Sequence, residues 1–140
     1  MKKILQESRR YILRFDLGED AIETLKGFCV EEKIVSGFVS GIGAVSEVVL
    51  GFYDLANKRY IDNSIVKNME IASFSGNFSV FENEPVIHAH GVFSDESGVC
   101  IGGHVKKMVV AATCEAFLIK LDEKIERIKN SEIELNLMEE

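Results

Sequence analysis

The sequence predicts an α+β fold, in which one main helix near the N-terminus packs on a largely antiparallel sheet. Two observations lead to this prediction. Apolar residues recur at helical spacing in one long early segment, and the chain after it changes to alternation and short apolar runs. The length of 140 residues is typical of one domain, so we expect residues 1–140 to form a single folded unit.

A strand and the helix are the first expected elements. Residues 11–15 (YILRF) predict the strand. Asp16 can cap the next element and Gly18 allows the chain to turn, so we expect a helix over about residues 19–33. Apolar residues three and four apart would form its buried stripe: Ala21, Leu25, Phe28 and Cys29.

Seven strand candidates follow the helix, and the first four are each bounded by Gly, Asn, Asp or Ser. The connections at Asn57-Lys58 and Ser94–Gly98 predict hairpins. The weakly charged residues 34–53 include four glycines and three serines, so we interpret them as two buried strands around a turn and not as a membrane span. The strand candidates are residues 35–41, 47–53, 59–66, 70–78, 86–93, 99–105 and 108–121.

The end of the chain is an acidic C-terminal extension, residues 122–140. Ile125 and Ile128 have helical spacing, whereas Ile133, Leu135 and Leu137 alternate like a strand. Because these apolar residues persist among the charges, we expect an ordered acidic edge and not a loose tail.

Charge and cysteine content limit the function classes. The 16 basic and 23 acidic residues give a net charge of −7, which disfavours proteins that bind nucleic acid or anionic membranes by neutralising phosphates. No signal-peptide pattern follows the first residues. Cys29, Cys100 and Cys114 are widely spaced and odd in number, which indicates reduced thiols in a cytoplasmic protein.

The three histidines of the chain, His88, His90 and His104, fall within 17 residues. His88 and His90 are two apart on a predicted strand, so both side chains leave the same face. If the next strand pairs with this one after the turn at Ser94–Gly98, His104 approaches the other two. Three neutral imidazoles suit zinc or a similar divalent metal and leave a coordination position for water or substrate.

Two glycines stand beside His104. Gly102 and Gly103 carry no side chains, which permits close strand packing or the approach of a small ligand. The alternative interpretation of the three histidines is that they are surface residues or hydrogen-bonded core residues without a metal.

Glu115 is the other candidate site residue. It interrupts an otherwise apolar run from Val109 to Ile119. A carboxylate in such a strand needs a partner if it is buried. It can accept the outer N–H of a metal-bound imidazole, or serve as acid or base for a metal-bound water. The alternative is that Glu115 faces solvent or a subunit boundary.

Several motifs together resemble the PPC (plants and prokaryotes conserved) domain, in the stand-alone prokaryotic form without an AT-hook. The resemblance covers about residues 9–121. The combination of GIGA, HxH and GGH in this order is its specific part. The matching segments are YILRFDLGED (11–20), SGFVSGIGA (36–44), LGFY (50–53), FSGN (74–77), HAH (88–90), GGH (102–104) and TCE (113–115).

This resemblance implies a curved antiparallel sheet, a homotrimer and a metal site, most often zinc, at His88, His90 and His104. It also implies the description as a candidate DNA-binding protein that stand-alone members carry. The Arg-Gly-Arg-Pro core of an AT-hook is absent here, since Pro85, the one proline, follows Glu84.

The sequence therefore leaves three functions open. The first is a homotrimeric zinc-binding module with a regulatory or binding role and no turnover. The second is a metal-dependent, hydrolase-like enzyme that acts on a small polar substrate. The third is direct binding of DNA, which the net charge of −7 disfavours. The first is the function we expect.

Overall fold

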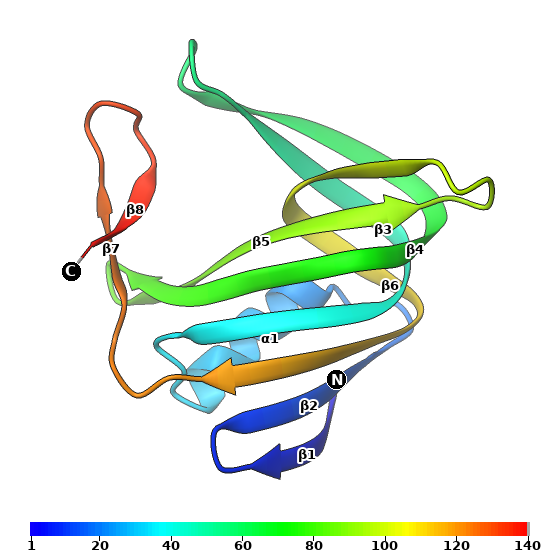
Figure 1. Cartoon of the computed structure of the whole chain (residues 1–140), viewed down its shortest axis with the longest axis horizontal. Helices are drawn as coiled ribbons and strands as arrows, with labels where there is room; N and C mark the ends of the chain where they lie inside the picture. Colours follow the sequence, from blue (N-terminus) through cyan, green and yellow to red (C-terminus); the bar gives the residue numbers. More distant parts are fainter. Residues whose placement is uncertain (140) are drawn as a thin grey trace.

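The computed structural model describes residues 1–139 and contains one helix and eight strands (Figure 1). This confirms the predicted α+β class with a largely antiparallel sheet. Within the described residues no helix is long and apolar enough to span a membrane. The elements are β1 (Lys2–Glu7), β2 (Arg10–Asp16), α1 (Ala21–Glu31), β3 (Gly37–Asp54), β4 (Arg59–Phe81), β5 (Glu84–Ser94), β6 (Cys100–Lys120), β7 (Glu126–Lys129) and β8 (Asn136–Glu139).

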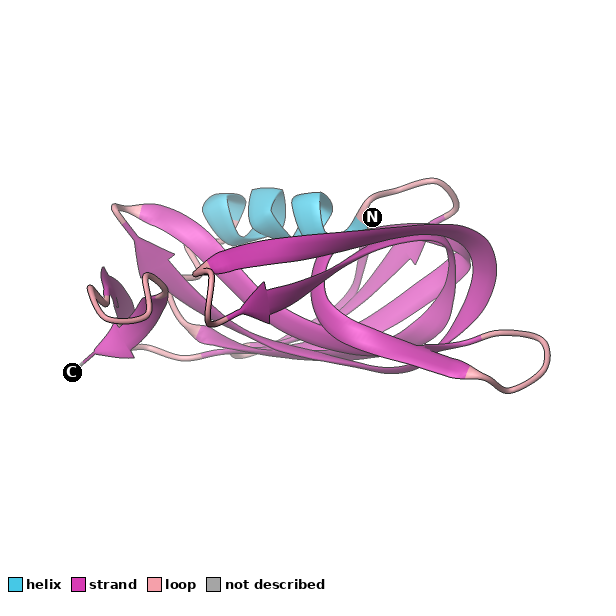
Figure 2. Cartoon of the chain, turned by 90° about the horizontal axis from the view of Figure 1, so that it is seen from above, coloured by secondary structure: helices cyan, strands magenta, loops and turns pink. Residues whose placement is uncertain are grey.

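Four strands close on one another. β3 pairs with β4 on one side and with β6 on the other, and β5 pairs with both β4 and β6. All four pairings are antiparallel, so the order β3–β4–β5–β6 returns to β3. β2 and β1 extend the sheet from β6, and the β7–β8 hairpin joins β4 through one parallel pair, Val80 with Glu126. Figure 2 shows the resulting curvature, with α1 against one side of the sheet.

The core lies between the helix and the inner face of the sheet. Alternate residues of β2 are buried, and the same alternation runs along β5 and the second half of β6. Tyr11 of β2 meets Phe28 of α1 edge to face, with ring centroids 5.4 Å apart. The predicted helical stripe is buried, together with Ile22: Ala21, Leu25, Phe28 and Cys29. Cys29 and Cys114 are buried free thiols, and Cys100 is an exposed one.

The helix begins two residues later than expected, and its cap is Asp20 and not Asp16. The Asp20 carboxylate accepts a hydrogen bond from the backbone N–H of Ile22 (3.0 Å), as an N-cap does. It also accepts one from the N–H of Met108 (3.3 Å). Asp20 thereby connects the start of the helix to β6, a contact that sequence spacing does not indicate.

The expected breaks inside three long strands are wrong. The two candidates at residues 35–41 and 47–53 form one strand, β3 (Gly37–Asp54), and not two strands around a turn. Its pairing with β4 shifts register between Gly41 and Gly43 and between Val45 and Glu47. Such shifts bend a strand and increase its twist without ending it. The other candidates merge in the same way into β4 and β6, while the hairpin turns at residues 57–58 and 94–98 are confirmed.

Sequence reasoning missed two short strands, β1 and β7. β1 has no buried residue, so it lacks the alternation of buried and exposed side chains that identifies a strand. Ile128, expected at helical spacing, lies in β7. The acidic extension is nonetheless ordered as a hairpin through Lys129 and Asn136.

We predict that Gly43→Ala destabilises the fold. Gly43 has φ +147°, and a Cβ there would overlap the carbonyl oxygen of Thr113 and lie 2.7 Å from the Cα of Cys114. Urea denaturation should show a loss of about 2–4 kcal/mol. Gly27→Ala is the matched control, because Gly27 lies in α1 with nothing within 4 Å of its added Cβ. It should gain about 0.5–1 kcal/mol. Equal stability of the Gly43→Ala variant and the wild type would contradict this account.

Candidate metal centre

The closure of β5 onto β6 brings the three histidines together, as the sequence predicts. His88 and His90 alternate with the buried residues Ile87 and Ala89, so they lie on the outer face of β5. His90 pairs directly with His104 of β6. One ring nitrogen from each histidine lies within 4.8 Å of the other two, and the ring centroids are 5.2–5.5 Å apart.

The three imidazoles differ in their exposure. His90 is exposed, whereas His88 and His104 are half-buried. Nδ1 of His104 is fully buried and has no hydrogen-bond partner among the described residues. A buried polar nitrogen without a partner costs about 1–3 kcal/mol. A ligand that binds the unpartnered ring nitrogens of this cluster would offset that cost.

Burial keeps the two inner rings neutral. Desolvation, followed by the nearby imidazoles of His88 and His90, lowers the pKa of His104 to about 4. Desolvation also lowers the pKa of His88, and the positive charge of Arg127 adds to this effect. Neutral imidazole is the form that binds a metal, so these two rings need not lose a proton first at neutral pH.

The donor set fits a zinc ion. Around a tetrahedral zinc with Zn–N bonds of about 2.0–2.1 Å, neighbouring ligand nitrogens are about 3.3 Å apart. The present separations of up to 4.8 Å are at most about 1.5 Å larger, so zinc binding would draw the three rings closer together. Three histidines would leave one tetrahedral position for water or another ligand.

Glycines keep the strands close at this point. A Cβ on Gly102 would lie 2.8 Å from the carbonyl oxygen of Gly91 on β5, and one on Gly103 would lie 3.3 Å from that of Gly51 on β3. A side chain on Gly51 would in turn meet the ring of Tyr60 at 2.9 Å. Because Gly51 has none, the Tyr60 ring crosses β3 and lies 5.4 Å from His104.

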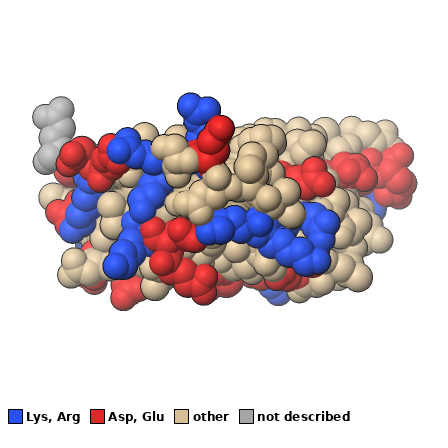
Figure 3. Space-filling model, turned by 90° about the horizontal axis from the view of Figure 1, so that it is seen from below, with Lys and Arg blue, Asp and Glu red and all other residues tan. Residues whose placement is uncertain are grey.

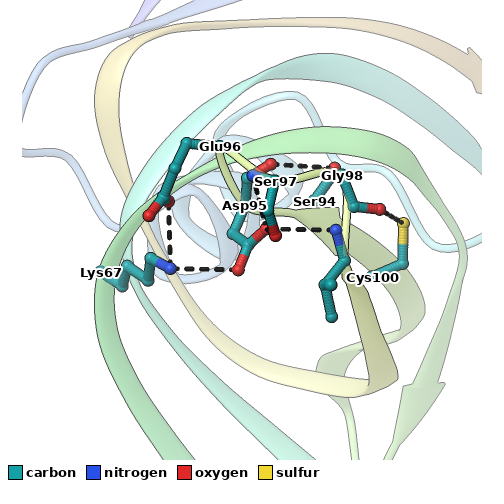
Figure 4. A network of polar contacts seen from close by, with 8 residues as sticks. Lys67, Ser94, Asp95, Glu96, Ser97, Gly98 and Cys100 are labelled. Carbon is teal, nitrogen blue, oxygen red and sulfur yellow. Dashed lines mark hydrogen bonds and ion pairs between the residues drawn. The ribbon is translucent and has the colours of Figure 1, made fainter.

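The hairpin turn between β5 and β6 is held by Asp95 (Figure 4). Its carboxylate accepts hydrogen bonds from the backbone N–H groups of Ser97 (2.9 Å) and Val99 (3.1 Å). It also accepts the Ser97 hydroxyl at 2.6 Å and the ammonium group of Lys67 at 3.1 Å. These bonds fix the turn that sets His90 opposite His104.

Glu115 is not brought to the histidines within the chain. It lies eleven residues after His104 on β6, about 35 Å of strand away. It is exposed and pairs with Arg14 of β2 and Ile42 of β3.

Two residues beside the histidines escaped sequence reasoning. Tyr60 comes from β4 and Arg127 from β7, and both line a cavity of about 360 Å³ with His88 and His104. Neither belongs to a motif, and Arg127 stands 23 residues after the last histidine. The one available signal was an arginine between isoleucines in the acidic extension.

A family model confirms the resemblance noted in the sequence. The Plants and Prokaryotes Conserved (PCC, also written PPC) domain matches residues 3–122. The chain belongs to this family. A search of curated proteins found no match.

Solved structures match the PPC-domain fold over nearly the whole chain. A metal-containing protein from Archaeoglobus fulgidus is 32% identical, with a TM-score of 0.89 and 100% of each chain covered. A PPC protein from Pyrococcus horikoshii is 32% identical, with a TM-score of 0.88, covering 100% of this chain and 98% of that one. A candidate DNA-binding protein from Bacteroides thetaiotaomicron is 27% identical, with a TM-score of 0.94, covering 96% of this chain and 94% of that one.

We predict that Asp95→Ala lowers the melting temperature and that the difference from the wild type depends on pH. The hydrogen bonds from Ser97 and the ion pair with Lys67 lower the pKa of Asp95 below its ordinary value near 3.8. A lowered folded-state pKa stabilises the fold above the unfolded pKa, and this stabilisation is lost as pH falls below about 4. Thermal melts should therefore show a large difference in melting temperature between the variant and the wild type at pH 7. At pH 2 this difference should be small. Glu96→Ala is the control, because Glu96 is exposed and bonds only Lys67 (3.0 Å) among the basic side chains described. A difference that is the same at both pH values would contradict the role of the carboxylate.

Proposed function

We propose that the protein, acting as one unit over residues 1–140, is a homotrimeric zinc-binding module with a regulatory or binding role in the cytoplasm. The observation that carries the metal part is the cluster of His88, His90 and His104, with one nitrogen of each within 4.8 Å of the others. The metal content of the Archaeoglobus fulgidus protein supports it, since that chain is 32% identical over its full length. Free thiols at all three cysteines agree with a reducing compartment.

We predict about one zinc per chain in untagged wild-type protein and its loss in His90→Ala. Removing one of three imidazoles leaves two ligands, too few for a tight zinc site. Elemental analysis measures the metal, and light scattering on the same samples measures the mass. Val92→Ala is the matched control, because Val92 is exposed two residues further along β5.

The zinc content and the mass of the His90→Ala variant together distinguish the possible roles of the metal. If the His90→Ala variant loses zinc and keeps its mass, the metal serves binding or chemistry. If its mass falls to that of a monomer, the metal holds the assembly together. Zinc-free wild-type protein would refute both the zinc module and the metal-dependent enzyme.

An apolar patch on the outer face of the sheet supports the homotrimer. Phe38 and Ile119 face each other across β3 and β6, and Phe117 and Ile42 lie beside them. These side chains are 47–64% exposed. Contiguous exposed apolar surface of this kind marks protein interfaces. Because most soluble oligomers are closed homo-oligomers, the proposed partner of this patch is another copy of the chain, and the family resemblance is what suggests three copies.

We predict that Phe117→Lys yields a folded monomer. A charge in the centre of the patch would have to be buried without a partner in the assembly, which costs several kcal/mol. Light scattering should give the mass of one chain, while circular dichroism should remain that of the wild type. Val66→Lys is the control, because Val66 is 79% exposed on the long β3–β4 hairpin, away from the patch. A Phe117→Lys protein that keeps the wild-type mass would place the interface elsewhere.

A metal-dependent enzyme is the alternative function, and the cavity of about 360 Å³ beside the histidines favours it. Zinc with an open position can activate water for attack on a small polar substrate. Glu115 does not reach this cavity in its own chain, so another group would have to move the proton. Hydrolysis that is detected with the wild type and lost with His90→Ala would establish this function.

Direct DNA binding is the function that the Bacteroides thetaiotaomicron relative suggests. The charge of this chain opposes it, because the basic residues near the N-terminus are paired with carboxylates. Figure 3 shows basic and acidic side chains next to each other on one face. Titration with duplex DNA at low salt, where phosphate contacts are strongest, decides the question. The pairs are Lys2–Asp16, Lys3–Glu32, Arg9–Asp122, Arg10–Glu7 and Arg14–Asp16.

A further inference from the structure

The cavity of about 360 Å³ beside the histidines has a wall that the family model does not include. Residues 3–122 match that model, whereas one side of the cavity is formed by the β7–β8 hairpin. This hairpin lies at the left of Figure 1, next to the beginning of β5, and the cavity between them is lined by Val86, Ile87 and His88 of β5. This wall of the metal centre therefore lies outside the segment that the family model matches, and Arg127 is its basic residue.

Arg127 is held in place by the strands around it. Its Nε donates a hydrogen bond to the hydroxyl of Ser79 (2.7 Å), one Nη to the carbonyl oxygen of Asn136 (2.7 Å) and the other to the side-chain oxygen of Asn77 (2.9 Å). Asn77 of β4 pairs directly with His88 of β5. The guanidinium thus lies beside the metal-binding face, where it lines the same cavity as His88 and His104.

No carboxylate neutralises this guanidinium. Within residues 1–139 Arg127 forms no ion pair, and it is half-buried. A guanidinium has five N–H groups, of which the bonds above use three, so two remain for another acceptor. A desolvated cation without a counter-ion is costly, and oxyanions are the ligands that its fork of donors fits.

The other charged groups in and near the cavity do not provide Arg127 with a counter-ion. Glu134 lines it as well, but it is exposed at the β7–β8 turn and lies beyond ion-pair distance of Arg127. The ammonium group of Lys106 lies 4.4 Å from the centroid of the Tyr60 ring. It forms an ion pair with the carboxylate of Asp62, with an N–O distance of 2.6 Å. The polar groups that contact Arg127, from Ser79, Asn77 and Asn136, are all uncharged. The zinc proposed above would add positive charge to the cavity.

We propose that this cavity binds a small oxyanion, a carboxylate or phosphate group of a small molecule, between the open coordination position of the metal and the guanidinium of Arg127. This inference rests on the proposed zinc site for one end of the ligand. Arg127 supplies the other end and orients the anion by its two free N–H groups. The volume of about 360 Å³ lies within the range of cavities that bind small molecules.

The test is calorimetric titration of the full chain with two probes, inorganic phosphate and acetate. Wild-type protein is used zinc-loaded without excess metal, and again metal-free. Arg127→Gln should retain zinc and bind the probes at least tenfold more weakly, since it loses a charge-assisted pair of donors. Lys129→Gln is the matched control, because Lys129 is exposed on the same strand and the charge change is equal.

Arg127→Lys serves as a second variant in case Arg127→Gln does not fold. It keeps the charge but not the planar fork, and it should bind several-fold more weakly than the wild type. Affinity equal to that of the wild type in both Arg127 variants, or no binding of either probe to the wild type, would overturn the proposal. Stronger binding of phosphate or of acetate identifies the oxyanion, and either result supports the proposal.

The metal-free titration separates this inference from the proposed function. If the wild type takes up no zinc, the zinc module fails. Probe binding that still depends on Arg127 then supports the oxyanion site by itself. Probe binding that is absent, or that Arg127→Gln leaves unchanged, overturns the site as well.

Discussion

The antiparallel pairing of β5 with both β4 and β6 is the constraint on which the other features depend. It closes four strands on one another, and it sets the register in which His90 faces His104. In an open sheet β5 would have one edge free, and the third histidine would lie on a separate strand edge. The Asp95 turn makes this pairing local in sequence, since only five residues separate the two strands. The candidate metal centre is therefore a direct product of the sheet closure.

Closure requires curvature, and the same glycines that provide it obscure the strands in the sequence. Gly41 and Gly43 flank a register shift in β3, where the backbone of β6 comes too close for a side chain. A glycine cluster between two apolar runs is typical of a turn, so the sequence favours two strands where there is one. Fold class and hairpin positions were predictable because local patterns determine them. Strand continuity was not, since it depends on the distance between β3 and β6, which are far apart in the chain.

In the candidate site, too, the sequence predicts the residues that local geometry brings together and misses those that depend on long-range contacts. The histidines were predictable because two share a strand face and the third follows a tight turn, so short-range geometry brings them together. Arg127 and Tyr60 were not, because their approach depends on a parallel contact between β7 and β4 and on the missing side chain at Gly51. For Glu115 the sequence left two interpretations open, a buried carboxylate with a partner or one that faces solvent or a subunit boundary, and the structure shows it exposed. The neighbours Phe117 and Ile119 are in fact exposed, so the apolar run marks a strand with two apolar faces and not a buried one.

The distribution of charge separates the surface of the protein from its cavity. The net charge of −7 belongs to the whole chain, and the basic residues of the first two strands are paired with carboxylates. Long-range attraction to a polyanion is therefore weak. The lining of the cavity lacks this acidic excess, because His88 and His104 are held neutral by burial and the exposed Glu134 forms no ion pair with Arg127. A short-range site of this kind favours a small anion that fits within it, because desolvation strengthens the contact inside and the acidic exterior excludes larger anions. The same acidic composition that argues against nucleic acid is thus compatible with an anion-binding centre.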